Sequence, residues 1–499
     1  MDSSVIKELD CEVFKNINCK NLPSLRRNIV YQFLYELLIV FIPLFTIPYV
    51  SRVLGAENIG LFSYTYAVAN YFVLFANLGI KNYGSRTIAM VRNNKEELNR
   101  NFSEILSIHI IFSIIVIFVY LVLLFFFVED NLVIFLIQSI YVFAAVFDIN
   151  WFFFGIEKFK LTVGRNTLVK ILSVFLVLVF VKTQTDLWIY ALILALSVFV
   201  GQSVVWFALK QYVSWRRPSW ANMKQHIRPL FVLFLPILAL SLYKYMDKIM
   251  LGSISSNVQV GFYENAEKII NVPMSLIMAF GVVLMPRIAN MVTSKDKGEV
   301  FKLIDMSMEA VMLLAIAISF GLAGISFVLA PIFFGYEFEE CGILIMGLAV
   351  TVPFMAFANV IRTQYLIPYK EDKIFVVSLF LGAAVNLIVN IILIPYMAAR
   401  GAVIGTIFAE IIVCIYQSYF VRKKIFIKKY LLNTIPPILI GIVMFVFVFQ
   451  IGNVMNINIV TLILQLLVGM FIYAVGVFLL MLKSRTRLMV LLRKFVVRY

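Results

Sequence analysis

Charged side chains are scarce in this sequence. Only 14% of the 499 residues are Asp, Glu, Lys or Arg, and 62% are hydrophobic, whereas a typical soluble domain carries about 25% charged residues. A chain with so little charge lacks the side chains that cover a water-facing surface. The composition therefore excludes a soluble enzyme, a disordered scaffold and a nucleic-acid-binding domain, and it is typical of a protein that lies largely within a membrane.

Residues that build catalytic and metal sites are also rare. The chain has two histidines, His109 and His226, and four cysteines whose spacing fits neither a metal site nor a CxxC pair. We find no Walker loop, zinc-binding spacing, Ser-His-Asp pattern or nucleotide-sugar signature. We therefore expect no enzymatic activity, no cofactor and no bound metal, and we interpret His109 as a packing histidine whose ring is satisfied.

Long apolar runs, separated by short charged or turn segments, make up most of the chain. A membrane-spanning helix needs about 20 apolar residues, and the runs predict fourteen such helices. The sequence therefore predicts an all-α polytopic membrane protein. The predicted spans are 28–51, 59–80, 103–128, 132–155, 161–181, 187–209, 229–252, 260–286, 303–330, 341–362, 374–396, 401–421, 430–450 and 457–482.

The positive charges alternate between the connections. Of the 43 Lys and Arg residues, 36 fall in the two tails and in every second connection, and three (Arg52, Lys182 and Arg400) fall in the others. Because cytoplasmic connections collect Lys and Arg, this asymmetry predicts that both termini are cytoplasmic. It also accounts for the net charge of +16, which in a soluble protein would indicate a nucleic-acid partner.

A repeat divides the first twelve spans into two sets of six. The run SRVLG at 51–55 precedes Gly60, and the run DKIMLG at 247–252 precedes Gly261 six spans later. An even number of intervening spans gives the halves the same orientation, which is typical of a parallel repeat with a central site. The predicted parts are a cytoplasmic N-terminal tail (1–27), an N-lobe (28–210), a cytoplasmic interlobe loop (211–228), a C-lobe (229–421), two extra spans (430–482) and a basic cytoplasmic tail (483–499).

Lysines inside the predicted spans are candidates for a binding site. An ionisable group costs about 2.5–3.5 kcal/mol to insert, so it should face a cavity or another charge. Lys170 lies near the middle of the fifth span, too deep to reach the membrane surface easily. It either lines a cavity for an anionic substrate or pairs with a carboxylate such as Glu36 or Asp148.

Two further charged groups lie on consecutive predicted helices. In each group the residues are three and four positions apart, which places them on one helix face. They form either a salt-bridge cluster between helices or part of a cavity, and Lys268 is the deeper and better cavity candidate of the second group. The groups are Lys244, Asp247 and Lys248, followed by Glu264, Glu267 and Lys268.

Acidic residues inside the spans have two candidate roles. Each one either neutralises a buried cation or carries a coupling proton, and we favour neutralisation. These acids are Glu36, Asp148, Asp247, Glu309 and Glu410.

Four sequence runs, in this order, resemble the Wzx-type polysaccharide exporter family, a branch of the multidrug, oligosaccharidyl-lipid and polysaccharide exporter superfamily. The resemblance covers about 27–420. The runs are PYVSRVLG at 48–55, DINWFFFGIEKF at 148–159, DKIMLG at 247–252, and IPY at 394–396 with GAVIG at 401–405.

The resemblance implies a V-shaped pair of six-helix bundles in the cytoplasmic membrane of a bacterium or archaeon. Such a protein moves an undecaprenyl-diphosphate-linked oligosaccharide to the outer leaflet by alternating access. The diphosphate and sugars enter a cationic central cavity while the polyprenyl tail stays in lipid. Membrane lipids, a polysaccharide polymerase and assembly proteins are the implied partners.

The resemblance also assigns cations to the cavity. Arg52 and Lys248 are the cations that precede Leu-Gly in the two halves, and Lys268 sits where lipid II flippases of the superfamily tend to place an arginine. Its counterpart in the first half is Ala67, which argues against a symmetric phosphate clamp. The predicted substrate-binding set is Lys170, Lys268, Lys244, Lys248 and Arg52.

Two other functions compete with this interpretation. A cation-coupled multidrug antiporter of the same superfamily would share the lobes but should have an acidic cavity. A membrane-embedded polymerase or ligase would need a long outer loop with polar catalytic residues. The longest outer connection, around 331–340, has about ten residues, which disfavours the polymerase.

Overall fold

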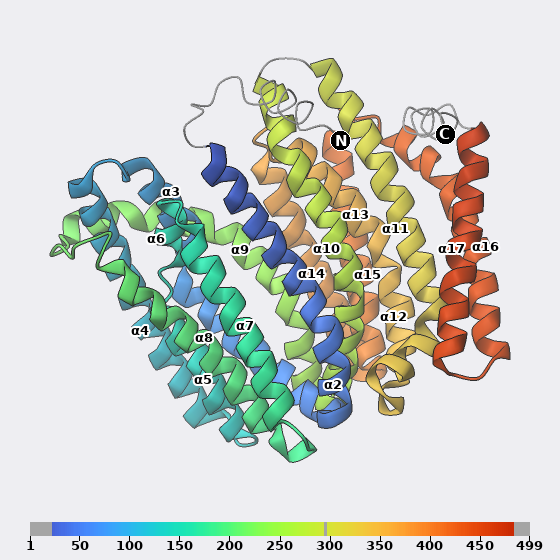
Figure 1. Cartoon of the computed structure of the whole chain (residues 1–499), viewed down its shortest axis with the longest axis horizontal. Coiled ribbons are helices and arrows are strands. Elements are labelled where there is room, and N and C mark those ends of the chain that lie inside the picture. Colours follow the sequence, from blue (N-terminus) through green and yellow to red (C-terminus); the bar gives the residue numbers. More distant parts are fainter. Residues whose placement is uncertain (1–21, 294–296, 484–499) are drawn as a thin grey trace.

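The computed structural model describes residues 22–293 and 297–483, and these residues form helices and short connections without a strand (Figure 1). The predicted all-α class is therefore confirmed. The helices are α2 (Leu22–Asn77), α3 (Ile80–Val91), α4 (Lys95–Phe127), α5 (Leu132–Val146), α6 (Asn150–Gly155), α7 (Phe159–Phe180), α8 (Leu187–Leu209), α9 (Trp220–Ile254), α10 (Asn257–Thr293), α11 (Lys297–Phe334), α12 (Cys341–Ala349), α13 (Thr351–Ile361), α14 (Asp372–Met397), α15 (Ala399–Val421), α16 (Ile427–Val454) and α17 (Ile459–Lys483), with single turns at η2 (Gln184–Asp186), η3 (Tyr336–Phe338) and η4 (Arg362–Leu366).

Thirteen helices of the described part are long and apolar enough to cross a membrane. The first two predicted spans, 28–51 and 59–80, both belong to α2, which contains a break at Gly55 (φ 78°, ψ 172°). Other predicted spans are interrupted: 132–155 comprises α5 and α6, and 341–362 comprises α12 and α13. The number and length of the helices confirm a polytopic membrane protein.

The helices form two groups with a pair of long helices between them. In Figure 1, α3 to α8 lie on one side and α10 to α17 on the other, while α2 and α9 run between the groups. α2 contacts α5 and α10, and α9 contacts both α3 and α14.

Below, the outer end of the molecule means the end that carries the break at Gly55, following the predicted orientation. The residue bounds assigned to the lobes remain predictions.

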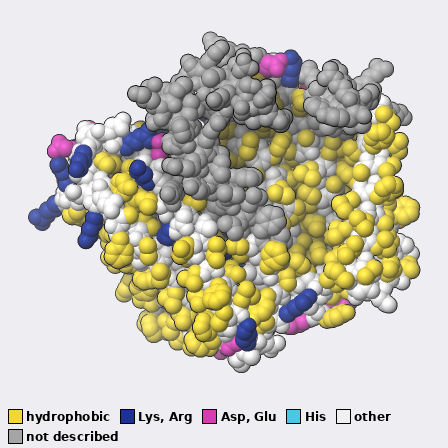
Figure 2. All heavy atoms as spheres, viewed as in Figure 1, with side chains coloured by type: hydrophobic (Ala, Val, Ile, Leu, Met, Phe, Trp, Pro, Cys, Tyr) yellow, Lys and Arg dark blue, Asp and Glu magenta, His cyan; other side chains and the backbone are white. Residues whose placement is uncertain are grey.

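The surface fits a lipid environment. On the face seen in Figure 2, hydrophobic side chains cover the middle of the molecule, and Lys and Arg lie towards its edges. Large apolar side chains such as Phe118 and Phe175 are more than half exposed. In water, such exposed apolar side chains would have to be covered by another protein. In a bilayer, the acyl chains of the lipids contact them directly.

Two small residues allow α2 and α10 to touch at the outer end. A Cβ atom added to Gly60 would lie 1.6 Å from the main-chain oxygen of Asn257, and one added to Gly261 would lie 2.1 Å from that of Ala56. Both distances are impossible for real side chains, so glycine is required at both positions. Gly60 and Gly261 are the equivalent glycines of the sequence repeat, and the repeat therefore meets itself at this contact. Close approach through small residues is typical of helices packed within membranes.

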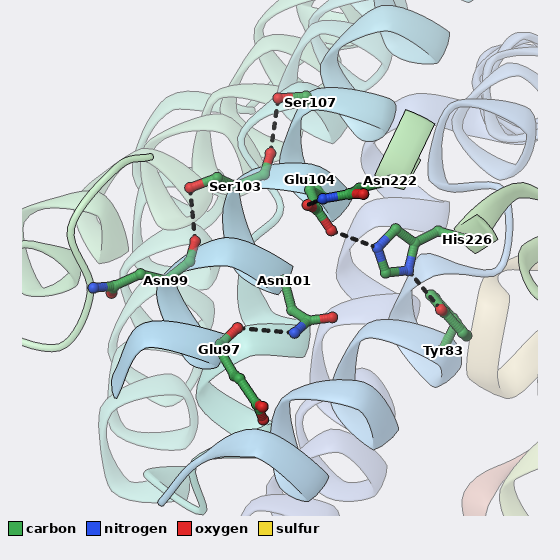
Figure 3. Close-up of polar contacts among 9 residues, drawn as sticks. All are labelled: Tyr83, Glu97, Asn99, Asn101, Ser103, Glu104, Ser107, Asn222 and His226. Atoms are coloured by element: carbon green, nitrogen blue, oxygen red, sulfur yellow. Dashed lines mark hydrogen bonds and ion pairs between the residues drawn. The ribbon is translucent and has the colours of Figure 1, made fainter. Parts of the chain in front are cut away.

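The beginning of α9 is bound to the first group of helices by buried polar contacts (Figure 3). His226 of α9 accepts or donates at both ring nitrogens, 2.6 Å from the Tyr83 hydroxyl and 3.0 Å from Glu104 Oε2. Asn222 donates to the other carboxylate oxygen of Glu104 at 3.0 Å. Glu104 and His226 are almost fully buried. The segment before α9 is held similarly, because the Ser214 amide donates to Asn99 Oδ1 at 3.0 Å.

We expect substitution of Gly60 by valine to separate the outer ends of α2 and α10. The new side chain has no room at the Asn257 oxygen, and such overpacking costs about 1–3 kcal/mol. Separation can be measured with a cysteine pair at Ser51 and Asn265, whose side chains are 2.9 Å apart across this contact, after the four native cysteines are replaced. Oxidative cross-linking of the pair should fall severalfold. Gly164→Val is the matched control, because a Cβ there meets no atom within 4 Å; an equal effect of both substitutions would contradict the expectation.

We expect Glu104→Ala to lower the melting temperature of the purified protein. The substitution leaves the half-buried Asn222 amide and the buried His226 ring without the carboxylate that binds them, which costs about 1–3 kcal/mol. Glu97→Ala, at an exposed position on the same helix, should leave the melting temperature nearly unchanged. Thermal unfolding in detergent followed by tryptophan fluorescence measures both; similar melting temperatures for the two variants would show that the buried contacts contribute little.

Candidate functional site

A polar cavity lies where the two helix groups face each other. It has a volume of about 130 Å³ and is lined by α2, α7, α8 and α10. We call it the central cavity. Lys170 of α7 and Lys268 of α10, almost one hundred positions apart in the sequence, both line it. Its other polar lining residues are Thr46, Ser51, Ser63, Ser173, Tyr190 and Asn265.

Lys170 is the lysine of this cavity whose charge is not balanced by a neighbour. Its side chain is exposed, and it makes no ion pair with any residue that the structure describes. Asp148, one of its two predicted partners, instead accepts two bonds from Asn150, at 3.0 and 2.7 Å. Glu36, the other predicted partner, lies outside the residues whose side chains the structure describes. An unbalanced cation in a small cavity is a suitable site for an anion.

Lys248 and Lys268 belong to a compact ion-pair cluster between α9 and α10. The Lys248 ammonium lies 2.5 Å from Glu264 Oε2 and 2.8 Å from Glu267 Oε2, and Lys268 lies 3.1 Å from Glu264 Oε1. The two positive charges of the lysines equal the two negative charges of the glutamates. Lys248 is 9% exposed and Lys268 is 33% exposed, so Lys268 is the member that reaches the central cavity. We call these four residues the lysine–glutamate cluster.

Asp247 does not share the environment of its neighbour Lys248. It is 3% exposed and accepts hydrogen bonds from Tyr263 at 2.6 Å, Asn390 at 2.5 Å and Thr406 at 3.0 Å. Lys244 is exposed, with its ammonium 5.3 Å from the centre of the Tyr245 ring. Of the first predicted group, Lys248 joins the ion-pair cluster with α10, whereas Asp247 is bound by donors from α10, α14 and α15. Adjacent residues on a helix point about 100° apart, so they need not meet the same partners.

Arg52 lies at the outer end and is absent from the lining of the central cavity. Its guanidinium donates to the main-chain oxygen of Ile332 at 2.5 Å. Close by, Glu337 Oε1 accepts from the Ala56 amide at 2.9 Å. Sequence reasoning missed Glu337, although it lies in the outer connection around 331–340. No local pattern could have found it, because Glu337 and Ala56 are 281 positions apart.

The remaining predicted acids are distributed rather than clustered. Glu410 is 6% exposed on α15 and acts electrostatically on Arg362. Glu309 of α11 lines a small cavity with Tyr430 and Asn433. Among the described residues, no group of three His, Cys, Asp or Glu side chains is placed to hold a metal ion.

The prediction for His109 is wrong in one respect. Its ring is fully buried on α4 as expected, but neither ring nitrogen has a hydrogen-bond partner among the described residues. Arg165 is a further polar residue that the sequence analysis did not single out. It lies in α7, where its guanidinium donates to Asn150 Oδ1 at 3.1 Å and to the Gly201 oxygen at 2.8 Å. Side-chain partners of this kind depend on which helices are adjacent, which the local sequence does not determine.

An apolar groove lies among the C-terminal helices. Its volume is about 850 Å³, and α11, α16 and α17 line it almost entirely with apolar side chains. Pro273 of α10 also contributes to its wall. Because Lys268 lies five residues before Pro273 on the same helix, α10 connects the polar cavity to the apolar groove.

The fold is similar to solved structures of transporters. A lipid II flippase MurJ structure in an inward closed conformation has a TM-score of 0.69 at 15% sequence identity, covering 90% of this chain and 97% of that chain. An inward-facing multidrug resistance MATE family transporter has a TM-score of 0.60 at 14% identity, covering 78% of this chain and 97% of that one. At these identities the likeness establishes the fold, which confirms the predicted architecture.

Sequence comparison identifies the family. A putative O-antigen transporter of Shigella dysenteriae is 24% identical over 408 residues, covering 79% of this chain and 99% of that protein. Another from Escherichia coli (strain K12) is 26% identical, covering 81% and 98%. Residues 25–292, more than half of the chain, match the family described as polysaccharide biosynthesis protein. The chain therefore belongs to the polysaccharide biosynthesis protein family.

Proposed function

We propose that this protein is a flippase, which moves an oligosaccharide linked by a diphosphate to a polyprenyl lipid from the inner to the outer leaflet of the cytoplasmic membrane. The family and the O-antigen transporters that match over most of their length support this class of substrate. The observation that carries the proposal is Lys170, a cation in the central cavity without an ion pair to any described residue. The diphosphate is the anion that pairs with it.

The charges of the cavity favour an anion over a cationic drug. The lysine–glutamate cluster is balanced, so Lys170 gives the lining a net positive charge. Hydrogen bonds to charged groups contribute about 1.5–3 kcal/mol each, and Ser51, Ser63 and Asn265 supply further polar groups for phosphate or sugar oxygens. A cation-coupled multidrug antiporter would need an acidic surplus, which these residues do not provide.

The cavity is too small for a sugar unit in this conformation. Its volume of about 130 Å³ lies well below the roughly 300–1,000 Å³ of an ordinary ligand pocket. Entry of the oligosaccharide therefore requires the helix groups to separate, as alternating access demands. The polyprenyl chain occupies the apolar groove of α11, α16 and α17, because α10 leads from Lys268 directly to its wall.

The membrane potential can drive this movement. Each charge that crosses the membrane gains about 2.3 kcal/mol per 100 mV, and a diphosphate carries roughly two negative charges, which an inside-negative potential moves outward. No coupling ion is then obligatory, and the acids of the predicted spans, Glu36, Asp148, Asp247, Glu309 and Glu410, balance charge. Asp247 fits this role because Tyr263, Asn390 and Thr406 all donate to its carboxylate.

The proposal includes an orientation and partners. Both termini lie in the cytoplasm, as the uneven distribution of Lys and Arg indicates. The flipped lipid is then consumed at the outer surface by a polysaccharide polymerase and assembly proteins. The protein itself performs transport and has no catalytic site.

We expect Lys170→Ala to reduce export about tenfold or more, because the lost contact to the diphosphate is worth about 1.5–3 kcal/mol. Lys170→Arg should keep most activity because it keeps the charge. In cells that lack the native gene, surface polysaccharide and cytoplasm-facing lipid-linked oligosaccharide measure export and its block.

The control for Lys170 is Lys182→Ala. Lys182 is exposed at the outer end of α7, where it contacts Tyr49, so its loss should leave export unchanged at equal expression. Full export by Lys170→Ala would contradict the anionic site. Normal lipid intermediates combined with altered drug sensitivity in cells lacking the protein would instead support the antiporter.

We expect Lys248→Met to destabilise the protein by about 3 kcal/mol, the lower end for breaking a buried ion pair, because it removes the shared cation from two half-buried glutamates. Adding Glu267→Gln restores the balance of charge and should recover the melting temperature and expression. If the role of Lys248 is to hold α9 against α10, the double variant also recovers export. Recovery of folding without export would show that Lys248 contacts the substrate instead.

A further inference from the structure

Two chain segments from opposite helix groups meet α2 at its break. The first segment of α2 ends at Leu54, Gly55 has a left-handed backbone (φ 78°), and the second segment begins at Ala56. The start of a helix leaves amide hydrogens without partners, and the end of a helix leaves carbonyl oxygens without partners. At the break in α2, both free amide hydrogens and free carbonyl oxygens are present, and they need hydrogen-bond partners from other segments of the chain.

Glu337 provides the partner for the start of the second α2 segment. Its Oε1 atom accepts from the Ala56 amide at 2.9 Å, so a carboxylate from the second helix group caps a helix that packs in the first. A carboxylate is favoured at a helix start because both the hydrogen bond and the helix dipole stabilise it. The next residue, Phe338, is fully buried, and its ring lies 5.9 Å from that of Phe262 on α10. Glu337 is therefore held in place by its neighbour.

Arg52 makes the reverse contact. Its guanidinium donates to the main-chain oxygen of Ile332 at 2.5 Å, and Ile332 lies in the last turn of α11, which ends at Phe334. A cation at the end of a helix is favoured by the dipole. A residue of α2 therefore caps α11, while the connection that follows α11 caps α2.

Gly55 makes this arrangement possible. A Cβ atom at this position would lie 3.1 Å from Glu337 Oε2 and 3.3 Å from the side-chain nitrogen of Gln184. Any other residue would crowd the carboxylate and would be strained at a positive φ. Gln184 comes from the connection between α7 and α8, so connections from both helix groups converge on this glycine.

We propose that Glu337 and Arg52 form a reciprocal latch, which holds the outer end closed in this conformation and must break when it opens. They act as positioning residues: they set the balance between closed and open states and do not contact the substrate. The Arg52 contact is solvent-exposed, and the Glu337 contact is partly buried at a residue that is itself exposed, so both are weak enough to be broken in every transport cycle. A helix cap or a dipole interaction typically shifts such an equilibrium about fivefold. The role in transport rests on the proposed function, but the latch itself does not depend on the substrate.

The test uses two reporters in the full chain without its native cysteines. Cross-linking of Ser51→Cys with Asn265→Cys reports closure, since these side chains are 2.9 Å apart. Labelling of Ser173→Cys by a membrane-impermeant maleimide, added outside right-side-out vesicles, reports opening, since Ser173 lines the central cavity. Glu337→Ala or Arg52→Ala should slow cross-linking about threefold to tenfold and speed labelling by a similar factor.

Three comparisons decide the outcome. Glu337→Gln should behave nearly as the native protein, because an amide oxygen still accepts from the Ala56 amide. Glu339→Ala, an exposed acid two residues away, should change neither reporter. Opposite changes of the two reporters at an unaltered melting temperature support the latch, since simple destabilisation would lower that temperature. If Glu337→Ala and Arg52→Ala match Glu339→Ala in both reporters, the latch is wrong, whether or not the protein is a flippase.

Discussion

The contact between Gly60 and Gly261 determines how the two helix groups can be arranged. At this point the main chains of α2 and α10 are so close that no side chain fits between them. The outer end of the molecule closes as a result. The polar groups beside the contact, such as Ser51 and Asn265, are then brought within hydrogen-bond distance across the groups. The central cavity lies next to this closed end, so its small size follows from the same approach.

Charge balance explains why Lys170 differs from the other charged residues near the cavity. Ions within a membrane are stable when they are paired, and most of the deep charges in the described residues are. Lys248 is enclosed by two glutamates, and Asp247 is surrounded by donors from three helices. Lys170 alone among the cavity lysines has neither arrangement in the described structure. The unusual feature of the site is therefore the absence of a partner for one cation rather than the number of cations.

The cation that precedes Leu-Gly has different contacts in the two halves of the repeat. Arg52 lies three residues before Gly55 and Lys248 lies four residues before Gly252. At these similar positions, Arg52 binds a helix end at the outer surface, whereas Lys248 is buried in an ion-pair cluster. Glutamates at 264 and 267 exist on α10, and the corresponding part of α2 has no charged residue. Similar positions in a duplicated fold therefore hold the same residue type but meet different neighbours.

The sequence by itself determined the class of the protein, because the length and number of apolar runs follow from the thickness of the bilayer. It also located the repeat and selected Lys170 and Lys268, since deep lysines are costly wherever they occur. Only the tertiary structure decided which residues meet. It gave Asp247 and Lys248 different partners, placed Arg52 outside the cavity lining and brought Glu337 to Ala56. It also left His109 without a hydrogen-bond partner among the described residues. Such contacts join residues as far apart as 281 positions. They depend on which helices pack together, and the periodicity of a single helix does not contain that information.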